Sequence, residues 1–209
     1  GIESSAPTPA SIQFDFDGAA LAPTFGPATM GFGAGGDGHF LVKGSVFARE
    51  TALPGQAAPE ARLYDQSDAA GNLLLWKGDG TESWSDVVFE ATLQSTDNDA
   101  IGVVFRYQDE ANHYRLTLNG ETNRRELVKV RDGVETVLAT AAKGTPFQTD
   151  MALKVVAIGD TIAVFLDGRS VFGGTVVDAE DPLAGGTVGL YSSEQRASIF
   201  DDIIVNRAE

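Results

Sequence analysis

Short apolar runs alternate with polar residues along most of the chain, and glycine, aspartate or asparagine separates one run from the next. A period of two residues is typical of β-strands with one buried face. Regular turn residues between short strands indicate a sandwich or a barrel. No long stretch has the period of an amphipathic helix. The pattern therefore predicts an all-β fold.

The predicted strands are clearest in the second half of the chain. The dipeptides Asp132-Gly133 and Asp167-Gly168 tolerate positive φ and so favour tight hairpins, and Gly159-Asp160 is a third turn. The predicted strands here are residues 86–94, 100–108, 113–119, 125–131, 135–141, 153–158, 161–166, 169–172, 187–191 and 198–206.

The first half of the chain has a weaker pattern. Strands are predicted at residues 12–16, 40–42 and 73–76. The five glycines of residues 31–38 predict a loop, and residues 51–70, which are polar and contain two prolines, predict a long surface excursion.

The length of the chain predicts one domain. Residues 1–10 are polar and rich in proline, so we expect a linker there. Residues 11–209 are then a single β-sandwich domain, since such domains reach about 250 residues.

Strand alternation assigns side chains to two faces. Apolar side chains of two neighbouring strands are expected to fill the core: Ile101, Val103, Phe105, Tyr107, Tyr114, Leu116 and Leu118. Polar side chains of the same strands are expected together on an outer, partly exposed face: Arg106, His113, Arg115 and Thr117.

Charge and composition narrow the function classes. The net charge of −15 argues against nucleic acid and anionic membrane surfaces as partners, because both require basic patches. It fits either solubility or carboxylates that hold Ca²⁺. The absence of cysteine excludes disulfides, thiolate catalysis and zinc fingers. No apolar run approaches the 18 residues of a membrane span.

Several segments resemble the bacterial laminin-G/concanavalin-A-like lectin domains. They are Asp99–Asp109 (DAIGVVFRYQD), Asn112–Arg115 (NHYR), Phe165–Gly168 (FLDG), Gly186–Tyr191 (GTVGLY) and Phe200–Val205 (FDDIIV). The thrombospondin C-terminal lectin-like domain resembles them more distantly. The resemblance implies an all-β, two-sheet antiparallel β-sandwich, a jelly roll of the concanavalin-A-like kind. It does not imply one activity, because this sandwich also hosts hydrolases, lyases and inert spacers.

The related laminarinase-type hydrolases often hold a structural calcium between their first and last strands. Phe14-Asp15-Phe16-Asp17-Gly18 resembles the first part of that site, and Phe200-Asp201-Asp202-Ile203 resembles the second. The resemblance implies Asp15 and Asp201 as calcium ligands, with Asp17 and Asp202 beside them. The alternative is that these aspartates are turn and edge residues of an acidic protein.

A second calcium candidate is the turn Asp97-Asn98-Asp99, in which Asp97 and Asp99 offer alternating carboxylates. Ordinary turn chemistry is the alternative explanation.

The motifs of related enzymes are missing. Laminarinase-type hydrolases carry Glu-x-Asp-x-x-Glu on one strand, but Glu82, Asp86 and Glu90 are spaced about 13 Å apart on an extended strand. The alginate lyase signatures are absent. The two histidines, His39 and His113, cannot form a three-histidine metal site.

A glycan site requires aromatic rings beside planar polar groups. We expect Arg106, His113 and Arg115 to form such a surface, with Trp76 and Trp84 at its rim. Two alternatives remain: both tryptophans belong to the core, and the cationic residues only balance nearby acids.

The favoured interpretation is a non-catalytic, calcium-stabilised carbohydrate-binding module of a secreted or cell-surface protein. We expect an extracellular or periplasmic location, a glycan or polysaccharide partner, and a larger multidomain chain. A structural domain without a small ligand, or a polysaccharide hydrolase or lyase, are the alternatives.

Overall fold

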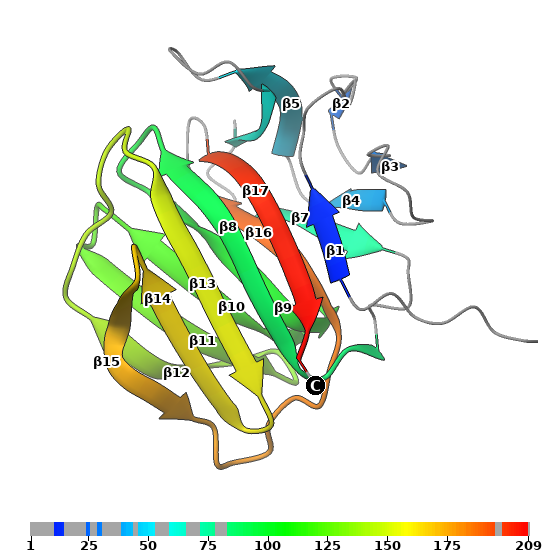
Figure 1. Ribbon diagram of the computed structural model, residues 1–209, viewed down its shortest axis with the longest axis vertical. Coiled ribbons are helices and arrows are strands. Elements are labelled where there is room, and N and C mark those ends of the chain that lie inside the picture. The colour runs from blue at the N-terminus through cyan, green and yellow to red at the C-terminus, as the bar shows by residue number, and fades with distance from the viewer. Residues whose placement is uncertain are drawn as a thin grey trace, which may run out of the picture.

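The computed structural model describes the backbone of residues 11–14, 24–25, 29–30, 39–43, 46–52, 59–65, 72–77, 83–194 and 198–208. Side chains are described for residues 73–76, 83–194 and 198–208. These parts form β-strands and their connecting turns (Figure 1). None of their segments is a helix with the length and apolarity to cross a membrane.

Nine strands form one sheet, here called sheet A. They are β1 (Ser11–Phe14), β2 (Thr24–Phe25), β5 (Val46–Ala52), β6 (Pro59–Asp65), β8 (Val87–Ser95), β13 (Met151–Ile158), β14 (Thr161–Leu166), β15 (Arg169–Val177) and β17 (Ser198–Arg207). Their order is β15-β14-β13-β8-β17-β6-β5-β2, and β1 pairs with β17.

Eight strands form the other sheet, sheet B. They are β3 (Thr29–Met30), β4 (His39–Lys43), β7 (Asn72–Lys77), β9 (Ala100–Asp109), β10 (Asn112–Asn119), β11 (Arg124–Arg131), β12 (Val134–Ala141) and β16 (Thr187–Ser193). Their order is β12-β11-β10-β9-β16-β7-β4-β3.

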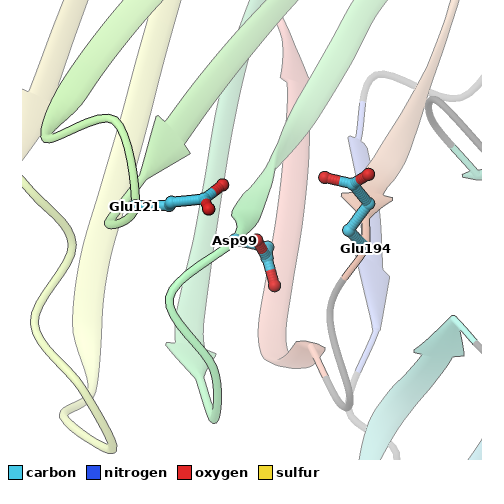
Figure 2. Close-up of side chains that lie close together, drawn as sticks. All are labelled: Asp99, Glu121 and Glu194. Atoms are coloured by element: carbon cyan, nitrogen blue, oxygen red, sulfur yellow. The ribbon is translucent and has the colours of Figure 1, made fainter. Parts of the chain in front are cut away.

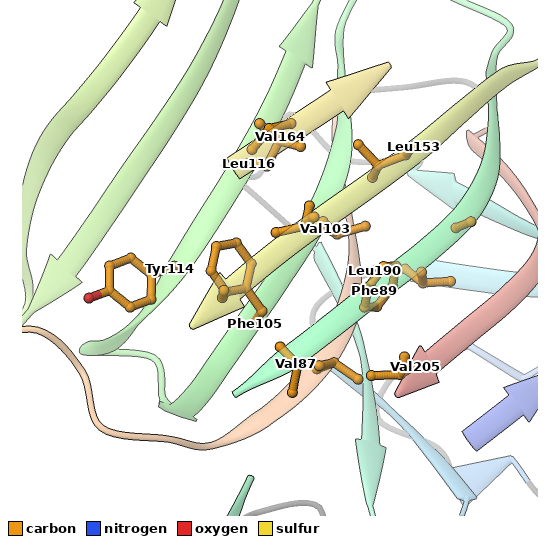
Figure 3. Close-up of a cluster of buried hydrophobic side chains, with 14 of the residues drawn as sticks. Val87, Phe89, Val103, Phe105, Tyr114, Leu116, Leu153, Val164, Leu190 and Val205 are labelled. Atoms are coloured by element: carbon orange, nitrogen blue, oxygen red, sulfur yellow. The ribbon is translucent and has the colours of Figure 1, made fainter. Parts of the chain in front are cut away.

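The two sheets stack face to face with the core between them (Figure 1). Buried side chains alternate with more exposed ones along β8, β13 and β14. The core contains Phe89 and Leu153 of sheet A and Val103 and Leu116 of sheet B. Figure 3 shows these side chains meeting in the space between the layers. The sequence prediction of a two-sheet antiparallel β-sandwich of jelly-roll type is therefore confirmed.

All of the strands predicted after residue 85 are present. At most of their ends, the observed bound lies within a few residues of the predicted bound. Two predicted hairpins have the expected backbone: φ is 51° at Asp132 and 77° at Gly133, and 52° at Asp167 and 72° at Gly168. Positive φ at both central residues matches the right-handed twist of the flanking strands.

The predicted surface excursion is wrong for residues 59–65. This segment is β6, which pairs with β5 along its whole length and with the start of β17. Its polar sequence gives little β-signal, so pairing with two neighbours determines its conformation. The predicted linker at residues 1–10 and loop at residues 31–38 lie outside the described residues.

The opening and closing strands lie side by side. β1 runs antiparallel to β17, with Ser11 opposite Asn206 and Phe14 opposite Ile203. This confirms the arrangement on which the predicted Asp15/Asp201 site depends. Asp15 and Asp17 themselves lie outside the described residues.

A buried polar network fixes the connection between β15 and β16. Lys129 Nζ donates to Asp178 Oδ1 at 2.7 Å, and Tyr114 Oη donates to Asp178 Oδ2 at 2.7 Å. The backbone N–H of Leu183 donates to Tyr114 Oη at 3.0 Å. Burial and the hydrogen bond to Asp178 raise the pKa of Tyr114 to about 12. The network therefore satisfies charged groups that would be costly to bury alone.

Candidate functional site

The outer face of sheet B, which points away from sheet A, carries the polar residues predicted for β10. Tyr114 and Leu116 are fully buried in the core. Strand alternation therefore directs His113 and Arg115 to the opposite face. The structure thus places both residues on this face, but only Arg115 is partly exposed, because His113 is buried with 6% of it exposed.

A β-bulge in β9 changes the faces of the two residues that follow Phe105. The pairing with β10 passes from Phe105↔Tyr114 to Asp109↔Asn112, so β9 advances further than its partner. Arg106 has a φ of 46°, in the left-handed region. Tyr107 consequently belongs to a cluster outside the main core, which corrects the prediction that it fills the space between the sheets.

Arg106 is a buried structural residue, and its predicted place on the outer face is wrong. Only 1% of it is exposed. Its guanidinium donates to the carbonyl oxygens of Ser85 at 2.6 Å, Gly159 at 2.8 Å and Leu183 at 3.1 Å, and lies 3.3 Å from Asp86 Oδ1. The bulge turns this side chain inward, where it joins three connecting segments and is not accessible to a glycan.

The two tryptophans also lie in the core. Trp76 is 3% exposed and Trp84 is 2% exposed, and both pack in the main hydrophobic cluster. The expectation that they form the rim of a glycan surface is therefore wrong. Their large apolar area favours burial between the sheets, which is the alternative that the sequence left open.

Aromatic rings support the two polar residues that do lie on the outer face. The rings of Tyr107 and His113 have centroids 5.3 Å apart. Arg115 Cζ lies 5.2 Å from the centroid of Tyr191, and Arg115 Nη2 donates to Glu135 Oε1 at 2.8 Å. A cation over a tyrosine ring is held by the ring quadrupole, so the guanidinium has a fixed orientation.

Gly102 lets the strands of sheet B approach closely beside Arg115 and Tyr191. In the register of sheet B, Gly102 lies between Thr117 of β10 and Tyr191 of β16. A Cβ at this position would lie 1.9 Å from the carbonyl oxygen of Leu116. The absent side chain therefore lets β9 and β10 pack closely.

Apolar side chains form the base of the outer face. They make a second buried cluster that is separate from the main core: Leu73, Leu75, Ala100, Val104, Tyr107 and Tyr191. Arg115 is 18% exposed and Glu135 is 56% exposed in their side chains, so the ion pair lies above this base. The arrangement offers planar donors and acceptors beside an apolar surface, which is the combination that sugars require.

The surroundings of His113 favour the neutral form of its ring. Burial lowers the pKa of His113, and the positive charge of Arg115 lowers it further, against the contact with the Asp109 carbonyl, which raises it. His113 Nδ1 lies 3.3 Å from that carbonyl oxygen. Because a carbonyl oxygen only accepts, Nδ1 is the donor in this contact, and Nε2 of the neutral ring is left as an acceptor.

Three carboxylates meet at one end of sheet B. Asp99, Glu121 and Glu194 come from three different turns, and one oxygen of each lies within 4.8 Å of the others (Figure 2). Partial burial, together with the charges of Asp97, Glu121 and Glu194, raises the pKa of Asp99. Such a group of oxygens could hold a hard cation.

The two calcium ligands predicted in the Asp97-Asn98-Asp99 turn thus have different surroundings in the structure. Asp99 joins Glu121 and Glu194, whereas Asp97 Oδ1 accepts from the backbone N–H of Asn98 at 2.9 Å. Glu121 and Glu194 were not predicted. Their turns meet the start of β9 because β10 and β16 both run antiparallel to it.

Asp201 and Asp202 lie on the outer face of sheet A, at an irregularity in the pairing of β17 with β8. Asp201 Oδ1 accepts from the backbone N–H of Asp202 at 2.8 Å, and Thr92 Oγ1 donates to Asp202 Oδ2 at 3.1 Å. Whether they share a cation with Asp15 and Asp17 stays a prediction, because both of those partners lie outside the described residues.

Solved structures with a similar fold include the carbohydrate-binding module CBM66 from Bacillus subtilis. It is 21% identical, with a TM-score of 0.59, over 70% of this chain and 86% of that chain. Domain 4 of AbnA, a GH43 extracellular arabinanase from Geobacillus stearothermophilus in complex with arabinotriose, is 12% identical with a TM-score of 0.58, over 95% and 91%. This chain has a lectin-like β-sandwich fold.

The lumenal domain of VIP36, in a form bound to Ca²⁺ and Man3GlcNAc, is also similar. It is 13% identical, with a TM-score of 0.55, over 81% of this chain and 84% of that chain. No protein-family model and no curated protein matches the sequence. At these identities the likeness shows the lectin-like fold, and membership of the concanavalin-A or laminin-G class stays a prediction.

Proposed function

We propose that this chain is a non-catalytic carbohydrate-binding module whose glycan site is the outer face of sheet B. The observation that carries the proposal is the arrangement of Arg115 over Tyr191 and against Glu135. The three structures described above, each solved for a carbohydrate-binding domain or with a bound saccharide, support it through their common fold.

Recognition follows from the chemistry of these side chains. The guanidinium of Arg115 donates to sugar oxygens, and Glu135 accepts from sugar hydroxyls. His113 is only 6% exposed and contacts the Asp109 carbonyl through Nδ1, so it supports this surface from below. Because Tyr191 and Tyr107 hold Arg115 and His113 in place, little side-chain entropy is lost when a ligand binds.

A screen of the intact protein against a glycan array tests the proposal. We expect at least one class of oligosaccharide to bind, and the substitution Arg115→Ala to weaken it about tenfold or more. Arg124→Ala is the matched control, because Arg124 is 63% exposed and pairs with Glu126 of its own strand, β11. Absence of any hit with folded protein, or equal binding by both variants, would support a structural domain without a small ligand.

Calcium is the second part of the proposal. Asp99, Glu121 and Glu194 supply the oxygen ligands that Ca²⁺ prefers, and VIP36 has a similar fold and was solved with Ca²⁺. Ligand linkage predicts a gain of roughly 2.7 kcal/mol at a hundredfold excess over the dissociation constant. EDTA should therefore lower the Tm of the wild type and leave that of Asp99→Asn unchanged. A thermal unfolding transition that EDTA does not change would contradict the calcium proposal.

A polysaccharide hydrolase is the second candidate, favoured by the same carboxylates. Their oxygens lie within 4.8 Å of one another, and retaining glycosidases hold two carboxyl groups about 5 Å apart. Release of reducing ends from a bound glycan, lost in Asp99→Asn, would establish this candidate in place of a non-catalytic module.

The same comparisons support a proposal about the setting of this chain. The similar AbnA structure is one domain of an extracellular enzyme, and VIP36 was solved as a lumenal domain. We therefore place this chain in an extracellular or periplasmic protein with further domains.

A further inference from the structure

Strands β14, β13, β8 and β17 lie side by side in sheet A (Figure 1). The outer face of the sheet is hollowed there. Two depressions, of about 290 and 530 Å³, share Thr92, Ala152 and Asp202 in their walls. We call this combined depression the sheet-A groove. It crosses four strands and lies on the side of the sandwich opposite the proposed glycan face.

Small residues create the groove, and an aromatic ring lines one part of it. Ala152 and Gly168 leave the space above β13 and the turn after β14 unfilled. The half-buried ring of Phe165 lines the larger depression. The groove therefore has an apolar surface on which the C–H face of a sugar can pack.

Charged residues surround this apolar surface and are mostly acidic. The described lining contains five carboxylates and one ammonium group: Glu90, Asp150, Asp167, Asp201, Asp202 and Lys154. Lys154 Nζ lies 2.9 Å from Glu90 Oε1, so the one cation is already neutralised. The groove consequently attracts positive ligands and repels negative ones.

Hydrogen bonds hold three of these carboxylates in place. Asp202 accepts from Thr92 at 3.1 Å, Asp150 accepts from Gln94 Nε2 at 2.8 Å, and Asp167 accepts from the backbone N–H of Ala152 at 3.0 Å. Each bond occupies one acceptor position of a group that has about four. The orientations of the carboxylates are thus set before a ligand arrives.

From this shape and charge we propose that the sheet-A groove binds a cationic glycan, an oligomer of amino sugars with free ammonium groups. The sugar ring packs on Phe165, and ammonium groups pair with Asp167 and Asp202. The carboxylates repel an anionic glycan, and a neutral glycan cannot form ion pairs with them. This site and the face bearing Arg115 lie on different sheets. An experiment can therefore disprove one of the two proposals without affecting the other.

Calorimetry with a glucosamine hexamer tests the proposal, with its N-acetylated counterpart as the neutral comparison and EDTA present throughout. We expect the hexamer to bind at least tenfold more tightly than the acetylated form, and added salt to reduce the difference. The double substitution Asp167→Asn with Asp202→Asn should weaken hexamer binding about tenfold or more. Arg115→Ala should leave it unchanged.

A second variant tests whether the groove binds sugar rings or attracts any cation through its acidic residues. Phe165→Ala should weaken the glucosamine hexamer severalfold while leaving hexalysine binding unchanged, and thermal unfolding checks that each variant is folded. Equal binding of free and acetylated hexamers, or hexalysine binding as sensitive to Phe165→Ala as the glycan, would overturn the proposal. Loss of hexamer binding in Arg115→Ala alone would overturn it by placing the ligand on sheet B.

Discussion

The outer faces of the two sheets differ in surface shape and in charge. On sheet B, Tyr107, Tyr191 and their aliphatic neighbours fill the surface, and Arg115 lies over it with Glu135 as its counter-ion. On sheet A, small residues leave a groove, and carboxylates such as Asp167 and Asp202 line it. One sandwich therefore presents two surfaces suited to ligands of different charge.

Two lysine–carboxylate pairs, one buried beside Tyr114 and one on the outer face of sheet A, differ in their burial. Lys129 and Asp178 are 9% and 3% exposed in their side chains, whereas Lys154 and Glu90 on sheet A are 45% and 39% exposed. A buried pair cannot lose one member without leaving an uncompensated charge, while water readily solvates either member of an exposed pair.

The largest effect expected from this contrast is on stability. Lys129→Met should lower the free energy of unfolding by about 3–5 kcal/mol, because it leaves the buried Asp178 without its cation. Lys154→Met is the matched control and should change it by about 0–1 kcal/mol. Urea denaturation measures both. Similar losses in the two variants would contradict the burial argument.

A smaller loss of stability is expected from a change at Gly102. Gly102→Ala should cost about 1–3 kcal/mol, because the new Cβ would meet the carbonyl oxygen of Leu116. Gly174→Ala, on β15 of sheet A, is the control, since its Cβ would meet nothing within 4 Å. A Gly102→Ala variant with wild-type stability would show that β9 and β10 are not held as closely as described.

The smallest effect is a pH dependence specific to sheet B. The pKa of His113 is lowered in the folded state, so its contribution to stability is present above the unfolded pKa of about 6.5 and is lost as pH falls through the lower folded value. His113→Phe keeps a ring beside Tyr107 but removes this titration. From pH 7 to pH 5, the urea midpoint should fall less in the variant than in the wild type. An equal fall in both proteins would contradict the lowered pKa of His113.

Much of the fold could be predicted from the sequence, because apolar alternation and Asp-Gly turns are local signals. The strands at Val87–Ser95 and Thr161–Leu166 are examples. Strand β6 could not be predicted, since its polar residues take their conformation from β5 and β17. Long-range pairing of this kind leaves no signal within the segment itself.

The candidate site was predicted less completely. Alternation correctly placed His113 and Arg115 on one face, but the bulge at Arg106 reversed the positions of Arg106 and Tyr107. A non-glycine residue with positive φ inside an apolar strand has no sequence signature. The partners of Asp99 follow from the strand order β10-β9-β16, which brings distant turns together and which the sequence does not reveal.

The most direct test of the central claim is an NMR titration of the protein with a neutral oligosaccharide identified on the array. We expect chemical-shift changes at residues of sheet B around Arg115, His113 and Tyr191, and none around Thr92, Ala152 and Asp202 of sheet A. Changes confined to sheet A, with sheet B unaffected at saturation, would contradict the assignment of the glycan site.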